Sequence, residues 1–383
     1  MLNGQTPRHC GDLIYAYPPF LALLWIPLTA VPATLRTVVW YSIAVGTVFL
    51  SLWVCEVLAR RLFPGEWSER ELVTLRILTF VLSSKFILAV LENQAYDSFA
   101  LIFLLLGLLA LTNGRWLLGA ASFATAAALK VTPLIFLPYL LFKRRFGAAG
   151  VFISVLILLT VLPDIVMPPK MQWHVTVWLR DVILAPLNVK PGFDLPFWVT
   201  DSPMNQTFRA AIVRMLTGTH EQQSFEIIFA IMQSKSFAIA LYSVMAIYIA
   251  VVLWIMLKSR RYNQLISVDG ALLVVSALLL TPVSSQSHFV ALMLPYALLV
   301  AALIKDETGR TFNGTMLLLS FVLATATSND LVGRSFTGWA LWNSLPVFGT
   351  LILVIPLGAL VWSLSSSRQP NKKSIAINDA IAG

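Results

Sequence analysis

Long apolar runs, separated by short polar intervals, make up most of the chain between Tyr17 and Ser363. Many approach the length of a bilayer span, for which roughly 20 helical residues are needed. The runs are rich in Leu, Ala, Phe and Val without strict alternation, so they predict helices and not barrel strands. A helix also bonds every backbone N–H and C=O within its own segment, as hydrocarbon requires. The pattern predicts an all-α, polytopic transmembrane helical bundle.

We expect about eleven or twelve hydrophobic segments in this bundle. They are Tyr17–Pro32, Thr37–Ala59, Leu72–Leu91, Asp97–Thr112, Trp116–Leu129, Val131–Phe142, Phe146–Leu162, Ser236–Leu257, Val268–Pro282, Phe289–Ile304, Phe312–Thr327 and Leu345–Ser363. The first contains four prolines, so a kinked span and a helix that enters and returns both stay open.

Alternate polar intervals carry most of the cations, which predicts an orientation. The basic intervals hold Arg60, Arg61 and Arg70; Arg115; Lys143, Arg144 and Arg145; Lys258, Arg260 and Arg261; Lys305 and Arg310; and Arg368, Lys372 and Lys373. The intervals Glu92–Tyr96, Ser284–His288 and Ser328–Asn343 hold one cation, Arg334. The positive-inside rule makes the first set cytoplasmic and the second set outward-facing. Topology thus accounts for the net charge of +9 without a nucleic-acid partner.

The domain organisation follows from this orientation. Residues 1–363 are expected to form a single transmembrane domain, and residues 163–235 its one large extracytoplasmic loop. A loop this long in a compact membrane protein is more often functional than idle. Residues 364–383 are polar and are expected to form a disordered cytoplasmic tail. The expected location is the plasma (inner) membrane, with multiple passes.

Ionisable and amide side chains cluster at the predicted outer ends of the helices. Ionisable groups at membrane depth are costly, so each is a functional candidate by default. Cations stabilise a phosphate leaving group, a carboxylate can deprotonate an acceptor hydroxyl, and amides suit sugar hydroxyls. A shared outward cavity is therefore expected from Asp12, Glu92, Asn93, Gln94, Asp97, Lys130, Asn205, Gln206, Arg209 and His288.

Simpler interpretations of these residues stay open. Lys130 could snorkel at a helix end, His288 could be a satisfied helix-end histidine, and Glu92 and Asp97 could be solvated helix caps. Lys85, in mid-segment, could snorkel or line the cavity. The sequence has no P-loop, GxGxxG, HExxH or GxSxG motif and no spacing that implies a metal site. No cofactor is expected.

Several short strings recur in an order typical of one enzyme family. They are Tyr17-Pro18-Pro19-Phe20, Glu92-Asn93-Gln94, Ala126 to Pro133 with Lys130, Asn205-Gln206 with Arg209, and Thr281-Pro282-Val283-Ser284 with His288. The ordered set resembles glycosyltransferase family 87, the polyprenyl-phosphate-mannose-dependent mannosyltransferases of the multi-span C-type class. At Glu92-Asn93-Gln94 that family usually has Gly-Gln-Xaa-Asn, so the match there is looser.

The resemblance implies that a hexose, with mannose as the expected sugar, is transferred on the extracytoplasmic side. The donor would be a polyprenyl-phosphate-linked sugar and the acceptor a glycolipid or glycan, with membrane lipids around both. In this family an aspartate in the first outer loop is the catalytic base. Against the family pattern, we expect this sequence to lack the first helix, and Asp12 lies very close to the Tyr-Pro-Pro string. Asp12, Glu92 and Asp97 are therefore all candidate bases.

The resemblance also gives the remaining candidates a role in binding the donor phosphate and sugar. These are Asn93, Gln94, Lys130, Asn205, Gln206, Arg209 and His288. Two other functions stay open: a transporter or flippase of a lipid-linked glycan, for which proline-broken helices are typical, and a catalytically inactive membrane subunit.

Overall fold

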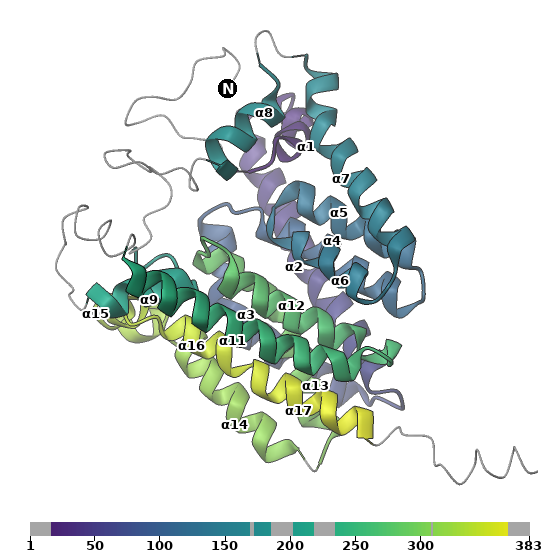
Figure 1. The fold of residues 1–383 in the computed structure, drawn as a ribbon, viewed down its shortest axis with the longest axis vertical. Helices are drawn as coiled ribbons and strands as arrows, with labels where there is room; N and C mark the ends of the chain where they lie inside the picture. Colours follow the sequence, from purple (N-terminus) through teal and green to yellow (C-terminus); the bar gives the residue numbers. More distant parts are fainter. Residues whose placement is uncertain (1–16, 169–171, 185–201, 218–233, 308, 367–383) are drawn as a thin grey trace, which may run out of the picture.

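The described part of the chain folds into a bundle of helices (Figure 1). A computed structural model of the protein describes residues 17–168, 172–184, 202–217, 234–307 and 309–366. Every element in these ranges is a helix, which confirms the predicted all-α class. Asp12 lies outside the described residues, as does the chain after Ser366.

The helices follow the predicted apolar runs closely. In chain order they are α1 (Pro19–Thr29), α2 (Ala33–Leu62), α3 (Glu69–Glu92), α4 (Asp97–Thr112), α5 (Trp116–Leu129), η1 (Thr132–Ile135), α6 (Phe136–Phe142), α7 (Phe146–Val166), α8 (His174–Trp178), η2 (Leu179–Leu184), α9 (Phe208–Thr217), α11 (Lys235–Ser259), η4 (Asn263–Leu265), α12 (Ile266–Leu280), η5 (Gln286–Leu292), α13 (Met293–Lys305), α14 (Arg310–Ser320), η6 (Phe321–Thr325), α15 (Asn329–Trp342), α16 (Leu345–Ile352) and α17 (Val354–Ser366).

Seven helical stretches of the described chain are long and apolar enough to cross a bilayer. They are Ala33–Leu62, Glu69–Glu92, Phe146–Val166, Lys235–Ser259, Asn263–Leu280, Gln286–Lys305 and Leu345–Ser366. An eighth span would be a broken one, in which Arg310–Thr325 and Asn329–Trp342 meet at an angle of 76°. The protein is therefore a multi-pass integral membrane protein.

Four of the predicted segments form helices too short to span on their own: α1, α4, α5 and η1 with α6. At 1.5 Å per residue, α4 with 16 residues and α5 with 14 residues reach only about 20–25 Å, less than the roughly 30 Å of hydrocarbon. α4 and α5 pack against each other, and α5 also packs on α7. Because these helices are shorter than the hydrocarbon thickness, polar groups at their ends can lie within the depth of the membrane.

The proline-rich first segment forms a helix too short to cross a bilayer on its own. α1 has only 11 residues, and the chain turns at Ala30–Pro32 into α2, where Arg36 donates from Nε to the carbonyl of Val31 at 2.8 Å. At the start of α1, the Tyr17 ring lies 5.4 Å from the ring of Tyr96, directly before α4. α1 therefore lies beside the start of α4 and does not cross the bundle.

The basic intervals meet at one end of the bundle, which we call the basic end. Arg61 donates to Thr112 Oγ1 at 3.0 Å, which joins the ends of α2 and α4. The guanidinium of Arg145 lies 4.4 Å from the ring centroid of Trp116, and Arg260 lies over the ring of Phe142 at 5.3 Å. The helix ends near Asp97, Lys130 and His288 are at the opposite end of the same helices.

Two polar intervals have more regular structure than the sequence predicted. The interval Ser328–Asn343 contains α15, an amphipathic helix whose exposed apolar residues include Leu331, Phe336 and Trp339. Within the predicted loop 163–235, α7 continues to Val166 and the helices α8, η2 and α9 follow. Short amphipathic helices were missed because their polar residues interrupt the apolar runs on which the prediction was based.

A buried polar cluster closes the basic end between α6 and α12. Asp269 is fully buried, and its Oδ2 lies 2.8 Å from Lys143 Nζ. The same oxygen accepts a hydrogen bond from the Tyr139 hydroxyl at 3.1 Å, and Oδ1 accepts one from Ser259. Because every oxygen of the carboxylate is used, the cluster holds α6, α11 and α12 together.

Breaking this cluster should destabilise the fold. We expect Asp269→Asn to lower the free energy of unfolding by about 3–5 kcal/mol, because it leaves the Lys143 ammonium buried and unpaired. Unfolding of the detergent-solubilised protein measures the effect. The double variant Asp269→Leu with Lys143→Met should recover most of the loss. Glu307→Gln, which removes an exposed ion pair with Arg310, should leave the unfolding midpoint unchanged. An equal shift of the unfolding midpoint in Asp269→Asn and Glu307→Gln would contradict the expectation.

Candidate functional site

A proline-induced break in the chain places Lys130 inside the protein. α5 ends at Leu129, four residues before Pro133. Pro133 has no N–H to donate, and in a continuous helix its ring would clash with the carbonyl of Leu129. Lys130 is therefore extended, with φ −154° and ψ 133°, and its side chain emerges between α5 and η1 although it is almost fully buried.

A second break positions His288. α12 ends at Leu280, and Thr281 is extended (φ −63°, ψ 151°), as expected for a residue before proline. The segment Pro282–Ser285 then leads into η5, which carries His288. Asn205 fixes this segment, because its Nδ2 donates to Pro282 O at 3.2 Å and its Oδ1 accepts from Ser284 N at 3.1 Å.

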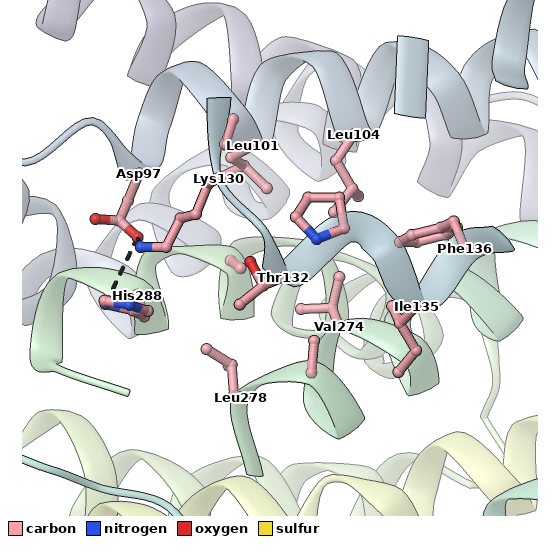
Figure 2. A pocket seen from close by; sticks show the side chains of 14 residues that line it. Asp97, Leu101, Leu104, Lys130, Thr132, Ile135, Phe136, Val274, Leu278 and His288 are labelled. Atoms are coloured by element: carbon pink, nitrogen blue, oxygen red, sulfur yellow. Dashed lines mark hydrogen bonds and ion pairs between the residues drawn. The ribbon is translucent and has the colours of Figure 1, made fainter. Parts of the chain in front are cut away.

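Asp97, the first residue of α4, joins the two breaks. Its Oδ1 forms an ion pair with Lys130 Nζ and lies 3.7 Å from His288 Nδ1 (Figure 2). His288 Nδ1 also lies 2.8 Å from Ser285 Oγ. Ser287 is close to the carboxylate, yet Asp97 Oδ2 has no hydrogen-bond partner of normal geometry in the described chain. Three predicted site residues from separate segments thus meet at one carboxylate.

The triad offers hydrogen-bond donors to the oxygen atoms of a ligand. The carboxylate is at the N-terminus of α4, where the helix dipole stabilises negative charge. A lysine ammonium has three N–H donors. In the described structure, Lys130 donates one of its three N–H groups to Asp97. The remaining donors and the imidazole can contact a ligand oxygen. Because burying an ion pair is often less favourable than apolar packing, such a pair is a candidate for function rather than stability.

The triad forms the polar end of a partly open cavity. The cavity has an empty volume of about 470 Å³, which includes open space. Its other walls are almost entirely apolar, contributed by three segments: Ala100, Leu101 and Leu104 of α4; Thr132, Pro133, Ile135 and Phe136 of η1 and α6; and Val274, Ala277, Leu278 and Ala291 of α12 and η5. Figure 2 shows Asp97, Lys130 and His288 at one end and Phe136 at the other. The cavity therefore matches a ligand with a polar, oxygen-bearing head and an apolar tail.

Other predicted site residues lie outside this cavity. Glu92, Asn93 and Gln94 are exposed on the turn between α3 and α4, and Asn93 Nδ2 donates to Ala89 O at 2.8 Å. Gln206 is buried, and its Nε2 donates to Leu341 O at 2.8 Å. With Asn205, it joins the segment before α9 to the segment Pro282–Ser285 and to the end of α15.

Two predicted cations also lie away from the cavity walls. Arg209 is half-buried on α9, and burial lowers the pKa of its guanidinium from the usual value. Its Nε has no hydrogen-bond partner in the described structure. Lys85 Nζ instead donates to Ala324 O at 3.0 Å and to Thr327 Oγ1 at 2.8 Å. Lys85 therefore caps the end of η6, a role that the sequence did not predict.

The sequence did not predict two residues that position the segments around the site, Arg214 and Tyr96. Arg214 donates to Ser202 O at 2.7 Å, Asn205 O at 2.8 Å and Ser344 Oγ at 2.7 Å, which fixes Asn205 in turn. Tyr96, directly before Asp97, is in ring contact with Trp25 at 5.5 Å. Arg214 follows Asn205 by nine residues, but no local pattern showed that it would donate to these carbonyls, which depends on tertiary structure.

Comparison with known proteins agrees with this architecture. The model of "Glycosyltransferase family 87" matches residues 15–282, a range that includes Asp97 and Lys130. The chain belongs to this family. It is a membrane glycosyltransferase, and the resemblance inferred from its short motifs is confirmed. This membership favours enzyme function over the transporter and inactive-subunit hypotheses.

A relative with a described activity aligns over most of the chain. The chain is 24% identical over 378 residues to the "Polyprenol-phosphate-mannose-dependent alpha-(1-2)-phosphatidylinositol pentamannoside mannosyltransferase" of Mycobacterium tuberculosis (strain CDC 1551 / Oshkosh). The alignment covers 95% of this chain and 76% of the relative. No solved structure matches the chain.

The contacts of Asn205 predict that its role is structural. Asn205→Ala would leave Pro282 O and Ser284 N without their partner, and each unsatisfied buried group costs roughly 1–3 kcal/mol. We expect a lower free energy of unfolding, measured on detergent-solubilised protein without ligand. The matched variant Asn263→Ala, at an exposed position, should not change it. A variant of Asn205 with unchanged stability but lost sugar transfer would instead indicate contact with substrate.

Proposed function

We propose that the protein transfers a hexose, with mannose as the expected sugar, from a polyprenyl-phosphate donor to a glycolipid or glycan acceptor. One observation carries the proposal: the cavity has a polar head that contains Lys130 and His288 and an apolar body in one continuous space. The mannosyltransferase name of the relative supports the choice of sugar and donor. The name also supports a glycolipid acceptor.

The head of the cavity suits the donor phosphate. In this reaction an acceptor hydroxyl oxygen forms a bond to the anomeric carbon of the sugar. The bond from that carbon to the phosphate oxygen breaks, and the polyprenyl phosphate leaves with the bonding electrons. Lys130 and His288 can donate hydrogen bonds to the phosphate oxygens as negative charge grows on them. The acceptor proton passes to a base.

Asp97 contacts Lys130, so it belongs to the leaving-group side of this arrangement. We assign Asp97 a positioning role, in which it holds the Lys130 ammonium and orients the His288 ring. An attack from the opposite face of the sugar would need a base elsewhere. Glu92, exposed on the nearby α3–α4 turn, and Asp12, outside the described residues, are the candidates for that role.

The body of the cavity suits the start of a polyprenyl chain. On α4, Asp97, Ala100, Leu101 and Leu104 have the spacing of one helix face. On α12, Val274, Ala277 and Leu278 have the same spacing. A lipid that lies between these faces gains dispersion contacts along its length and keeps its phosphate beside Lys130.

The sidedness of the proposed reaction rests on the charge distribution. The basic end collects the cationic intervals, and the positive-inside rule makes that end cytoplasmic. The cavity head would then face the extracytoplasmic side of the plasma membrane, as the sequence predicted.

Cysteine labelling tests this orientation. In a background with Cys10 replaced, we expect Asn93→Cys to react with an impermeant maleimide applied to intact cells. Arg144→Cys, at the basic end, should react only after the cells are permeabilised. Both positions are exposed, so accessibility within the protein is matched. The reverse pattern would overturn the proposed sidedness.

Loss of the cavity lysine should abolish most of the transfer. We expect Lys130→Met to lower kcat about 10²–10³-fold with a polyprenyl-phosphate-mannose donor, the usual effect of removing one donor to a developing anion. Lys130→Arg should retain part of the activity because it keeps the charge. Radiolabelled sugar transfer in membranes measures both.

Two controls separate chemistry from folding in this test. Lys130→Met leaves Asp97 unpaired, so the double variant with Asp97→Asn should restore stability without restoring activity. Asn263→Ala, exposed and outside the cavity, should keep normal transfer. Full activity of a folded Lys130→Met variant would exclude this cavity as the donor site.

A further inference from the structure

The cavity is blocked at the end away from its polar head. Phe136 lines that end and is fully buried. Its ring stacks on Phe123, with centroids 4.1 Å apart and planes at 23°. On its other side it meets the edge of Tyr139 at 6.2 Å. We call Phe123, Phe136 and Tyr139 the aromatic floor.

The aromatic floor is fixed by a hydrogen bond from Tyr139 to a buried ion pair. The Tyr139 hydroxyl donates to Asp269 Oδ2 at 3.1 Å, and Asp269 pairs with Lys143 at 2.8 Å. Tyr139 therefore cannot rotate away without leaving a buried carboxylate short of a donor, which is unfavourable. Phe136 is packed against this fixed ring, so the floor resists opening along the direction of α6.

The distance from the polar head to the floor is short. Along α4 the cavity wall runs from Asp97 to Leu104, and seven residues rise about 10 Å, roughly the length of two isoprene units. A polyprenyl tail is longer than this space. With its phosphate at Lys130, the tail must turn out of the cavity before it reaches Phe136.

We infer that Phe136 sets how much of the lipid donor the enzyme holds: the isoprene units nearest the phosphate lie in the cavity, and the rest of the tail lies in the bilayer. Phe136 is thus a specificity-determining residue for the phosphate-proximal end of the lipid. The inference rests on the proposed function, because it takes a polyprenyl phosphate as the occupant.

Photo-crosslinking with position-labelled donors tests the inference without requiring turnover. Polyprenyl-phosphate-mannose analogues would carry a diazirine on the second, third or fifth isoprene unit. In the wild-type protein, the second-unit label should crosslink to the cavity walls, at Leu101, Leu104 or Ile135. The third- and fifth-unit labels should crosslink mainly to added phospholipid. Mass spectrometry of peptides and lipids measures both, with excess unlabelled donor as competitor.

The variant Phe136→Ala should lengthen the cavity. We expect crosslinks of the third-unit label to the Tyr139 peptide to rise at least fivefold, whereas the fifth-unit label stays in lipid. Phe152→Ala is the matched control, because Phe152 is also fully buried in the main core but does not line the cavity. Phe136→Leu, a smaller change, should give an intermediate shift if the alanine variant folds poorly.

The outcomes separate the two proposals. One outcome is that the second-unit label crosslinks to the cavity and unlabelled donor suppresses this, while the third-unit pattern does not change in Phe136→Ala and Phe136→Leu. That outcome would overturn the role of Phe136 and leave the proposed function in place. Third-unit crosslinks to Tyr139 in the wild-type protein would also overturn it. Competed crosslinks found only outside the cavity would overturn the proposed donor site itself.

Discussion

The buried ion pair between Asp97 and Lys130 is the interaction on which the candidate site depends. It joins the start of α4 to the end of α5, and His288 approaches the same carboxylate from η5. Each residue is at a helix end, where backbone polarity already favours charge. Without the pair, Lys130 would be a buried cation without a counter-charge, which proteins avoid at considerable cost. The site therefore exists only when α4, α5 and η5 are packed together.

A second ion pair, Lys143 with Asp269, lies at the other end of the segment that contains η1 and α6. The segment from Lys130 to Lys143 is fixed by a carboxylate at each end, Asp97 near its start and Asp269 at its close. The cavity lies along this segment. Fixing both ends limits how far its walls can separate, so the cavity has a defined length and a closed floor. Such rigidity suits a site that orients a phosphate for displacement.

Much of the candidate site was predictable because charge in an apolar run is conspicuous. Asp97, Lys130 and His288 were identified from their positions at helix ends, and the structure brings them together. Asn205, Gln206 and Arg209 carried the same signal, yet they lie outside the cavity, and the two amides bond backbone groups. The two amides have partners more than 70 positions away, which a local pattern cannot show. Lys85 was ambiguous for the same reason, since its partners are on η6.

The sequence by itself determined the class of protein, the approximate positions of its helices, the gathering of cations at one end and the resemblance to its family. These follow from hydrophobic length, charge spacing and short motifs, which are local properties. Only the tertiary structure decided which polar residues share a cavity, that α1 lies beside the start of α4, and that Phe136 lies at the far end of the cavity. These depend on packing between segments far apart in the chain. That packing determines which of several possible cations lies close enough to pair with a buried carboxylate.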